Sequence, residues 1–345
     1  MLLGAFAALI VVRAAVTARR DITLSGLQIG FVEQVRRRLA EKLAAAPWPV
    51  VSRLQHARVT NMLTGDIQRV GTAALFTVQL STALVLTLCF ILTIDAGRKG
   101  TRKSWRWLGA AWGFSALLNP ALLSLMPFSF AHAAAANQKA WISYVRSLAV
   151  ASLVFVAVIS PWLIRNYSVF GRPVFLRDNF WFEFSLGNYH FSNGMGWASK
   201  HPDGNPAIGQ QAIQLGELAF IEVHKREALG FVRKNPAEFL QLTAHRMLWF
   251  WDGTSLLYQG QEWWRPWEFW PLSFLAWLGL LFVLTRRPTG WILYAAALVI
   301  YPAPYYLTYP HAKYRYAIEP EMLLLGVYLA SVVWGEIRRQ RAPRS

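Results

Sequence analysis

The apolar residues of this chain gather into long uncharged runs, which basic or polar segments separate. A helix of about 20 apolar residues is long enough to cross the hydrocarbon core of a bilayer. We therefore predict an all-α polytopic membrane protein with about six transmembrane helices. The predicted spans are residues 72–94, 107–136, 148–164, 269–284, 291–307 and 318–334.

Two apolar runs depart from a simple span. Asn119-Pro120 interrupts residues 107–136 near the middle. Proline removes a helix hydrogen bond, so this run is predicted to kink or to fold back as a re-entrant hairpin. Residues 1–12 are apolar but shorter than a full span, and we expect them to be the inner half of a longer helix.

Two long segments are polar. Residues 13–70 are basic and carry apolar positions at helical spacing, which predicts a long amphipathic helix broken at Pro47-Trp48-Pro49 and then a second helix. The excess of Lys and Arg favours the cytoplasmic side for this segment. Residues 165–268 combine turn signals with helical periodicity on either side of Asn235-Pro236, and they end in a cluster of Trp. They predict a mainly helical extracytoplasmic domain that returns to the membrane interface.

Composition agrees with this interpretation. Hydrophobic residues make up 55% of the chain and charged residues only 15%, below the roughly 25% of soluble domains. The net charge is +17. Its basic residues flank apolar spans and do not form one basic face, so they favour cytoplasmic loops and anionic lipid over nucleic acid. The single cysteine, Cys89, lies in an apolar run and excludes an intrachain disulfide.

The distribution of charge conflicts with a simple threading of the spans. If residues 13–70 are cytoplasmic and residues 72–94 cross once, the basic cluster at 98–106 lies outside, against the positive-inside rule. If residues 107–136 form a re-entrant hairpin, both of its basic flanks lie inside, and residues 72–94 cannot be a simple crossing. The sequence leaves both arrangements open.

Residues 100–345 resemble the C-terminal part of GT-C membrane glycosyltransferases, the class that includes protein mannosyltransferases and aminoarabinose transferases. The resemblance rests on three stretches and on the segment from Asn188 to His245-Arg246 between them. The stretches are WL to LLNPALL over 107–123, SPWLIRNYSVFG at 160–171 and KYRYAIEP at 313–320. It implies transfer of a sugar from a polyprenyl phosphate carrier, in a bacterial inner (plasma) membrane.

Residues 1–95 resemble part of an ABC exporter transmembrane domain. RRRL at 36–39 through AAPW at 45–48 is similar to its first intracellular helix, and LTGDIQRVG at 63–71 to its coupling region. The chain has no glycine-rich phosphate loop ending in Gly-Lys-Ser/Thr, so ATP-dependent transport would require a separate ATPase subunit. The two resemblances together divide the chain into residues 1–95, 96–164, 165–268 and 269–345.

Both parts are expected to be shorter than their families. The transferase-like part lacks the N-terminal spans whose first extracytoplasmic loop carries the general base in this class, so whether it is an enzyme is left open. Three hypotheses remain: a GT-C-like module, an exporter fragment, and a non-catalytic fusion of the two. The fusion hypothesis predicts few contacts between residues 1–95 and 107–334. None of the three calls for a cofactor; the expected partners are the bilayer, a lipid-linked sugar and the separate ATPase.

Sugar transfer from a lipid phosphate needs a carboxylate to deprotonate the acceptor and cations to stabilise the leaving phosphate. His311, Lys313 and Arg315 lie in a short extracytoplasmic loop next to a span, and Arg165 follows another span directly; these four are the candidate lipid-phosphate ligands. Interfacial snorkelling is the alternative role for each. Glu319 is expected to pair with Arg315 four residues earlier.

No acidic residue stands out as the base. Glu183, Asp178, Asp203 and Asp252 are all expected outside, and the pattern does not select among them. An active enzyme would need one of these acids to lie near the 311–315 loop in space. The histidines show no spacing typical of a metal site.

Overall fold

The computed structural model describes residues 67–136, 141–190, 192–195, 200–202, 205–253 and 265–341, together with residues 41 and 45. The chain divides into two compact units, Met1–Leu80 and Ser81–Ser345. Most of the first unit lies outside the described residues, including the predicted amphipathic helix and its break at Pro47-Trp48-Pro49. Of the exporter-like motifs, residues 36–39, 46–48 and 63–66 also lie outside the described residues, whereas residues 67–71 are described and helical.

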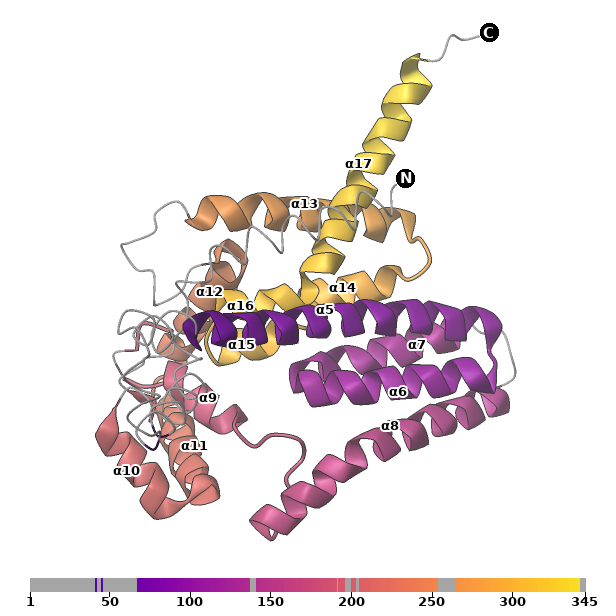
Figure 1. Cartoon of the computed structure of the whole chain (residues 1–345). Coiled ribbons are helices and arrows are strands. Elements are labelled where there is room, and N and C mark those ends of the chain that lie inside the picture. The colour runs from indigo at the N-terminus through magenta and orange to yellow at the C-terminus, as the bar shows by residue number, and fades with distance from the viewer. Residues whose placement is uncertain are drawn as a thin grey trace. The chain divides into compact units, whose positions relative to one another are not determined.

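The described part of the chain contains helices and no strands, which confirms the all-α prediction (Figure 1). In chain order the helices are α5 (Ile67–Lys99), α6 (Arg102–Leu118), η4 (Pro120–Leu125), α7 (Met126–Ala136), α8 (Trp141–Phe170), α9 (Phe180–Gly187), α10 (Pro206–Leu215), α11 (Glu217–Lys234), α12 (Pro236–Asp252), α13 (Arg265–Arg286), α14 (Trp291–Val299), α15 (Ala303–Leu307), α16 (Ala312–Arg315), η7 (Tyr316–Ile318) and α17 (Glu319–Arg341).

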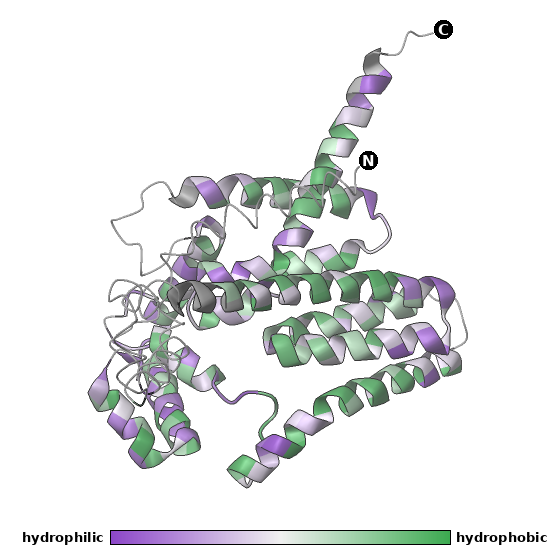
Figure 2. Cartoon of the chain, in the orientation of Figure 1, coloured by the Kyte–Doolittle hydropathy of each residue, from purple (hydrophilic) through white to green (hydrophobic). Residues whose placement is uncertain are grey.

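Four described segments are long and apolar enough to cross a membrane: Phe76–Lys99, Trp141–Phe170, Trp267–Arg286 and Ala312–Glu336. The chain is therefore a multi-pass membrane protein in its described part. The two remaining runs, Pro120–Ala136 and Trp291–Leu307, are shorter apolar helices. Figure 2 shows the apolar colouring concentrated along the long helices.

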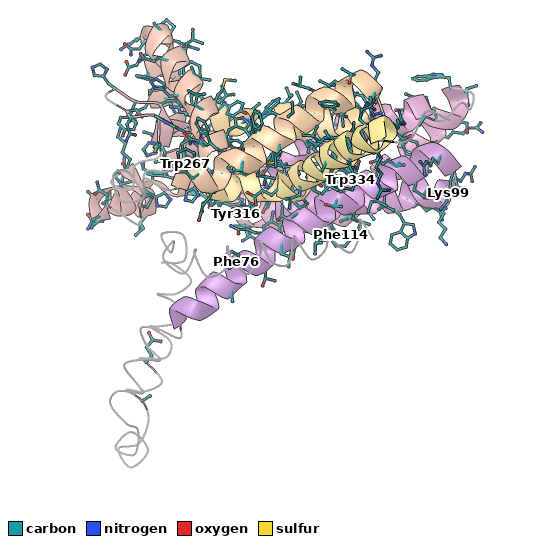
Figure 3. The ribbon with its side chains drawn as sticks, turned by 90° about the horizontal axis from the view of Figure 1, so that it is seen from above. Phe76, Lys99, Phe114, Trp267, Tyr316 and Trp334 are labelled. Carbon is teal, nitrogen blue, oxygen red and sulfur yellow. The ribbon has the colours of Figure 1, made fainter. Side chains whose placement is uncertain are left out.

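The helix α8 illustrates why lipid suits these surfaces. Leu153 and Ile164 leave 70% and 66% of their surface exposed, and Val156 is also exposed. Exposure of these apolar side chains to water would cost free energy, whereas the hydrocarbon core of a bilayer solvates them. Exposed Trp267 and Trp334 lie towards opposite ends of the packed pair α13 and α17 (Figure 3). Trp at both ends of a span is typical of anchoring at the two membrane interfaces.

Residues 102–136 fold back on themselves at Asn119-Pro120. The side chain of Asn119 accepts a hydrogen bond from the Ala121 amide at 3.1 Å and caps η4, while Pro120 stands at a position where its missing N–H costs nothing. The Trp105 ring on α6 lies 6.3 Å from the Phe130 ring on α7, so the two helices run side by side. Of the two predictions for this segment, the structure has the hairpin.

Both ends of this hairpin lie beside the end of α5. Ser104 donates a hydrogen bond to Asp95 at 2.8 Å, and a Cβ on Gly97 would lie 2.9 Å from the Cβ of Ala136. Gly290, just after Arg286-Arg287, is also close to the α5 residue Ile94. The basic residues at 98–106 therefore lie at the same end of the unit as Arg286-Arg287 and the start of α8. Within residues 81–345 these basic clusters therefore share one end, as the positive-inside rule favours.

The main core includes residues from the end of α5. Leu86, Cys89 and Phe90 are buried with residues of α6, α13, α14 and α17. Thr87 donates a hydrogen bond to Glu321 at 2.9 Å, and the hydroxyls of Thr93 and Ser129 are 2.6 Å apart. The expectation of few contacts between residues 1–95 and 107–334 is thus wrong for residues 81–95. The structural boundary falls after Leu80, because the apolar face of α5 beyond that residue is buried in the core of the second unit.

Candidate functional site

The loop between α15 and α17 carries three of the four predicted phosphate ligands. His311 is the N-cap of α16, and its Nδ1 accepts a hydrogen bond from the backbone amide of Lys313 at 3.1 Å. Lys313 is half-buried, with its ammonium 4.9 Å from the centre of the Tyr314 ring. Local capping thus fixes the direction in which the loop presents Lys313.

Arg315 is turned into the protein. It is fully buried and donates hydrogen bonds to Ser273 Oγ at 2.8 Å and to the Trp251 carbonyl at 2.8 Å. Its Nε lies 3.5 Å from a carboxylate oxygen of Glu319, so the predicted ion pair is present. A guanidinium engaged in this way ties the loop to α12 and α13.

Arg165 makes local contacts. Its guanidinium donates to the Asn166 side chain at 3.0 Å and lies 5.1 Å over the Trp162 ring, near the end of α8. Asn166 is buried and donates to the Val174 and Leu176 carbonyls, which turns the chain out of α8. The structure does not bring Arg165 into contact with the 311–315 loop.

A carboxylate reaches the loop from α9. Glu183 lies in the first turn of that helix and accepts a hydrogen bond from Asn179 at 3.3 Å. It is within electrostatic range of the Lys313 ammonium. Burial and the neighbouring Glu183 carboxylate raise the pKa of the Tyr309 phenol far above its ordinary value. An active enzyme was expected to have an acidic residue near the 311–315 loop, and the sequence did not show which one. Glu183 is an acid at that place.

A group of tyrosines connects Glu183 to the tip of the hairpin. The Tyr314 hydroxyl donates to the Tyr309 hydroxyl at 3.3 Å, and the Tyr305 and Tyr314 rings stack 4.3 Å apart. Tyr301 donates to the Tyr314 carbonyl at 2.8 Å and receives the Asn119 amide at 3.4 Å. These hydroxyls form a polar cluster inside an otherwise apolar bundle.

Arg246 of α12 holds α9 in place. It is fully buried and donates to the carbonyls of Gly187 at 2.5 Å, Gly194 at 2.8 Å and Leu307 at 3.1 Å, and to the Asn188 side chain at 3.1 Å. Burial lowers its pKa to about 10, which leaves the side chain protonated at neutral pH. Arg246 thereby joins the end of α9 to the end of α15, on either side of the site.

The other acidic candidates lie elsewhere or have other partners. Asp178 pairs with Arg172 at 3.5 Å, and Asp203 lies outside the described residues. Asp252 is the last residue of α12. Among the described residues, no group of three His, Cys, Asp or Glu side chains could hold a metal ion.

Sequence reasoning missed Glu321. It follows the predicted Glu319-Pro320 entry by one residue, lies in an apolar span and is fully buried, with Thr87 as its hydrogen-bond donor. A carboxyl group inside a span is costly and is commonly functional. Its appearance within an otherwise apolar helix was the signal that could have identified it.

Comparison with protein families, with curated proteins and with solved structures gives no match for this chain. The functional assignment therefore rests on the geometry of the site.

Proposed function

We propose that the chain is a GT-C-like membrane glycosyltransferase module that uses a polyprenyl-phosphate-linked sugar as donor. The observation that carries the proposal is that Glu183 lies within electrostatic range of Lys313 at the 311–315 loop. Glu183 offers a general base and Lys313 a cation at one site, the two groups that this reaction needs.

The proposed reaction balances without a cofactor. The Glu183 carboxylate removes the proton of an acceptor hydroxyl, and the resulting oxygen attacks the anomeric carbon of the donor sugar. The bond between that carbon and the phosphate oxygen breaks. The released polyprenyl phosphate carries the electron pair as negative charge, which Lys313 stabilises.

The proposal assigns the basic end of residues 81–345 to the cytoplasm and the domain between α8 and α13 to the opposite side. In a Cys89→Ala background, Lys103→Cys and Arg286→Cys should resist an impermeant thiol reagent in intact cells, and Glu217→Cys should react. All three side chains are exposed, so reactivity reports location. Labelling of Lys103→Cys together with Glu217→Cys would contradict this topology.

The exporter-fragment hypothesis receives less support. Most of its motif residues lie outside the described residues, and residues 81–95 pack into the same core as Tyr301 and Tyr305. The non-catalytic fusion is retained as an outcome of the functional test.

That test separates binding from transfer. The protein is reconstituted into nanodiscs with a polyprenyl phosphate, and bound lipid is counted by native mass spectrometry. We expect Lys313→Met to weaken lipid binding and Glu183→Gln to preserve it. With lipid-linked sugars extracted from bacterial membranes, Glu183→Gln should slow transfer by about 10²–10⁴-fold.

Matched controls come from α11. Lys234→Met and Glu217→Gln remove the same charges at exposed positions and should leave binding and transfer unchanged. Lipid binding without transfer by the unmodified protein would favour the non-catalytic hypothesis. Binding that is indifferent to Lys313 would remove the basis for the proposal.

A further inference from the structure

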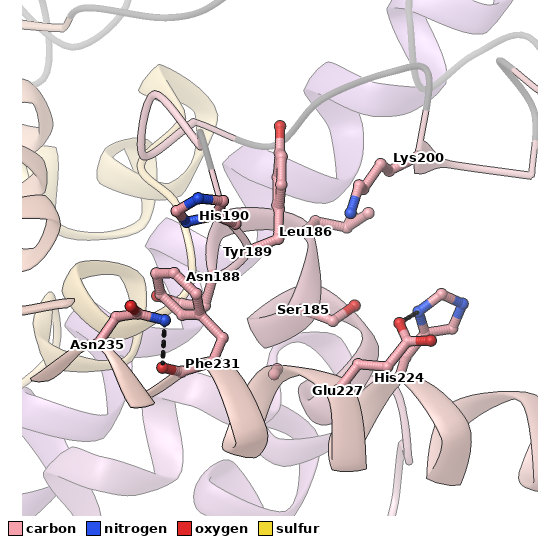
Figure 4. Close-up of a pocket in the computed structure, with 11 residues that line it drawn as sticks. Ser185, Leu186, Asn188, Tyr189, His190, Lys200, His224, Glu227, Phe231 and Asn235 are labelled. Carbon is pink, nitrogen blue, oxygen red and sulfur yellow. Dashed lines mark hydrogen bonds and ion pairs between the residues drawn. The ribbon is translucent and has the colours of Figure 1, made fainter. Parts of the chain in front are cut away.

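The extracytoplasmic segment contains a cavity of about 280 Å³ that the proposed reaction does not use. Its walls come from the end of α9 and the residues after it, from Lys200, and from one face of α11 (Figure 4). Sites for drug-sized ligands begin at roughly 300 Å³. This cavity therefore suits a ligand smaller than a typical drug molecule.

One end of the cavity is charged. Lys200, His224 and Glu227 lie together at this end in Figure 4. The Nδ1 atom of His224 is 3.5 Å from a carboxylate oxygen of Glu227, and Lys200 is near enough to act on the imidazole electrostatically. Two opposite charges thus flank one imidazole.

Burial favours the uncharged form of the imidazole between them. Burial is the main cause that lowers the pKa of His224, which packs against the Phe220 ring at 4.4 Å. Its Nε2 is buried and has no hydrogen-bond partner among the described residues. The charged end therefore carries one cation, one anion and a neutral hydrogen-bonding ring.

The other end of the cavity is aromatic and amide-lined. Phe231 and Asn235 lie there in Figure 4, away from the charged group. Asn235 donates to the Phe231 carbonyl at 3.2 Å, which leaves its own side-chain oxygen as an acceptor. Tyr189 lies along the wall, with the Lys200 ammonium 3.8 Å from the centre of its ring. This end offers a flat apolar surface with a polar edge.

We propose that this cavity binds a small zwitterion of the α-amino-acid type. Its carboxylate would face Lys200, its ammonium would face Glu227 and its side chain would lie against Phe231. A simple anion would face Glu227 and a simple cation would face Lys200, so a ligand with both charged groups on one carbon complements the end best. The inference stands apart from the transfer reaction, since it concerns binding by different residues.

The test uses three related probes on the full chain in nanodiscs, followed by calorimetry. The probes are L-phenylalanine, its amide, which lacks the carboxylate, and N-acetyl-L-phenylalanine, which lacks the ammonium. We expect L-phenylalanine to bind about two- to fivefold more tightly than either derivative, the size expected for a partly exposed charge pair.

Two variants assign the charges. Lys200→Met should abolish the preference for L-phenylalanine over its amide, and Glu227→Gln should abolish the preference over the N-acetyl derivative. Lys234→Met and Glu217→Gln, exposed on α11 outside the cavity lining, should preserve both preferences. The proposal is overturned if L-phenylalanine does not bind, if both derivatives bind as tightly as L-phenylalanine, or if a neutral hexose does so.

Discussion

Substitution of Arg246 by methionine is expected to destabilise the protein by about 3–5 kcal/mol. Methionine approximates the length of arginine but provides no hydrogen-bond donor. The carbonyls of Gly187, Gly194 and Leu307 and the side-chain oxygen of Asn188 would lose the donor that they share in a fully buried position. Buried acceptors without a partner cost more free energy than a hydrogen bond gains.

The measurement is the unfolding temperature of the purified protein in detergent, which should fall by roughly 5–10 °C. Arg226→Met is the matched control, because the Arg226 side chain on α11 is 76% exposed, and its loss should change the temperature little. Arg246→Lys should lie between the two, since lysine has three donors where arginine has five. An unchanged unfolding temperature in Arg246→Met would show that α9 is held by other contacts.

The second large effect is expected for Gly109→Val at the contact of α6 with α8. A Cβ at Gly109 would overlap the backbone carbonyl of Ala151, so the two helices must separate to accept a side chain. Ala151 is fully buried at this contact, and helix backbones cannot give way as a flexible side chain can. We expect a loss of about 3 kcal/mol or more.

Gly230→Ala provides the contrast. Gly230 lies within α11, and nothing stands within 4 Å of a Cβ added there. Alanine is the better helix former, so this change should stabilise the protein by about 0.5–1 kcal/mol. Thermal unfolding in detergent compares the two variants directly. Equal unfolding temperatures for Gly109→Val and the unmodified protein would mean that α6 and α8 do not pack closely.

Local chemistry made several elements predictable. The break between α11 and α12 falls at Asn235-Pro236 as predicted, because proline is favoured in the first turn of a helix and cannot continue one. Asn119-Pro120 was predicted to kink or to reverse its span, and the structure has the reversal. The reversal depends on packing between the two arms of the hairpin, such as the contact of Trp105 with Phe130. The sequence near Asn119 does not encode that contact.

The candidate site was predictable only in part. The sequence located Lys313 and His311 and the Arg315–Glu319 pair, since all are close along the chain. It did not select Glu183 from the other acids. The approach of α9 to the loop depends on Arg246, which joins Gly187 to Leu307 from a third helix. No local pattern encodes such a connection.

The sequence by itself determined that the chain is helical and apolar enough to cross a membrane, and where its turns and basic flanks lie. These properties follow from the period of apolar residues and from proline, glycine and charge, which act over a few neighbouring residues. Tertiary packing decided that Arg315 is buried, that residues 81–95 join the main core and that Glu183 comes within electrostatic range of Lys313. Those outcomes depend on how apolar faces far apart in the chain pack together, and close packing selects one arrangement among the many that the same helices allow.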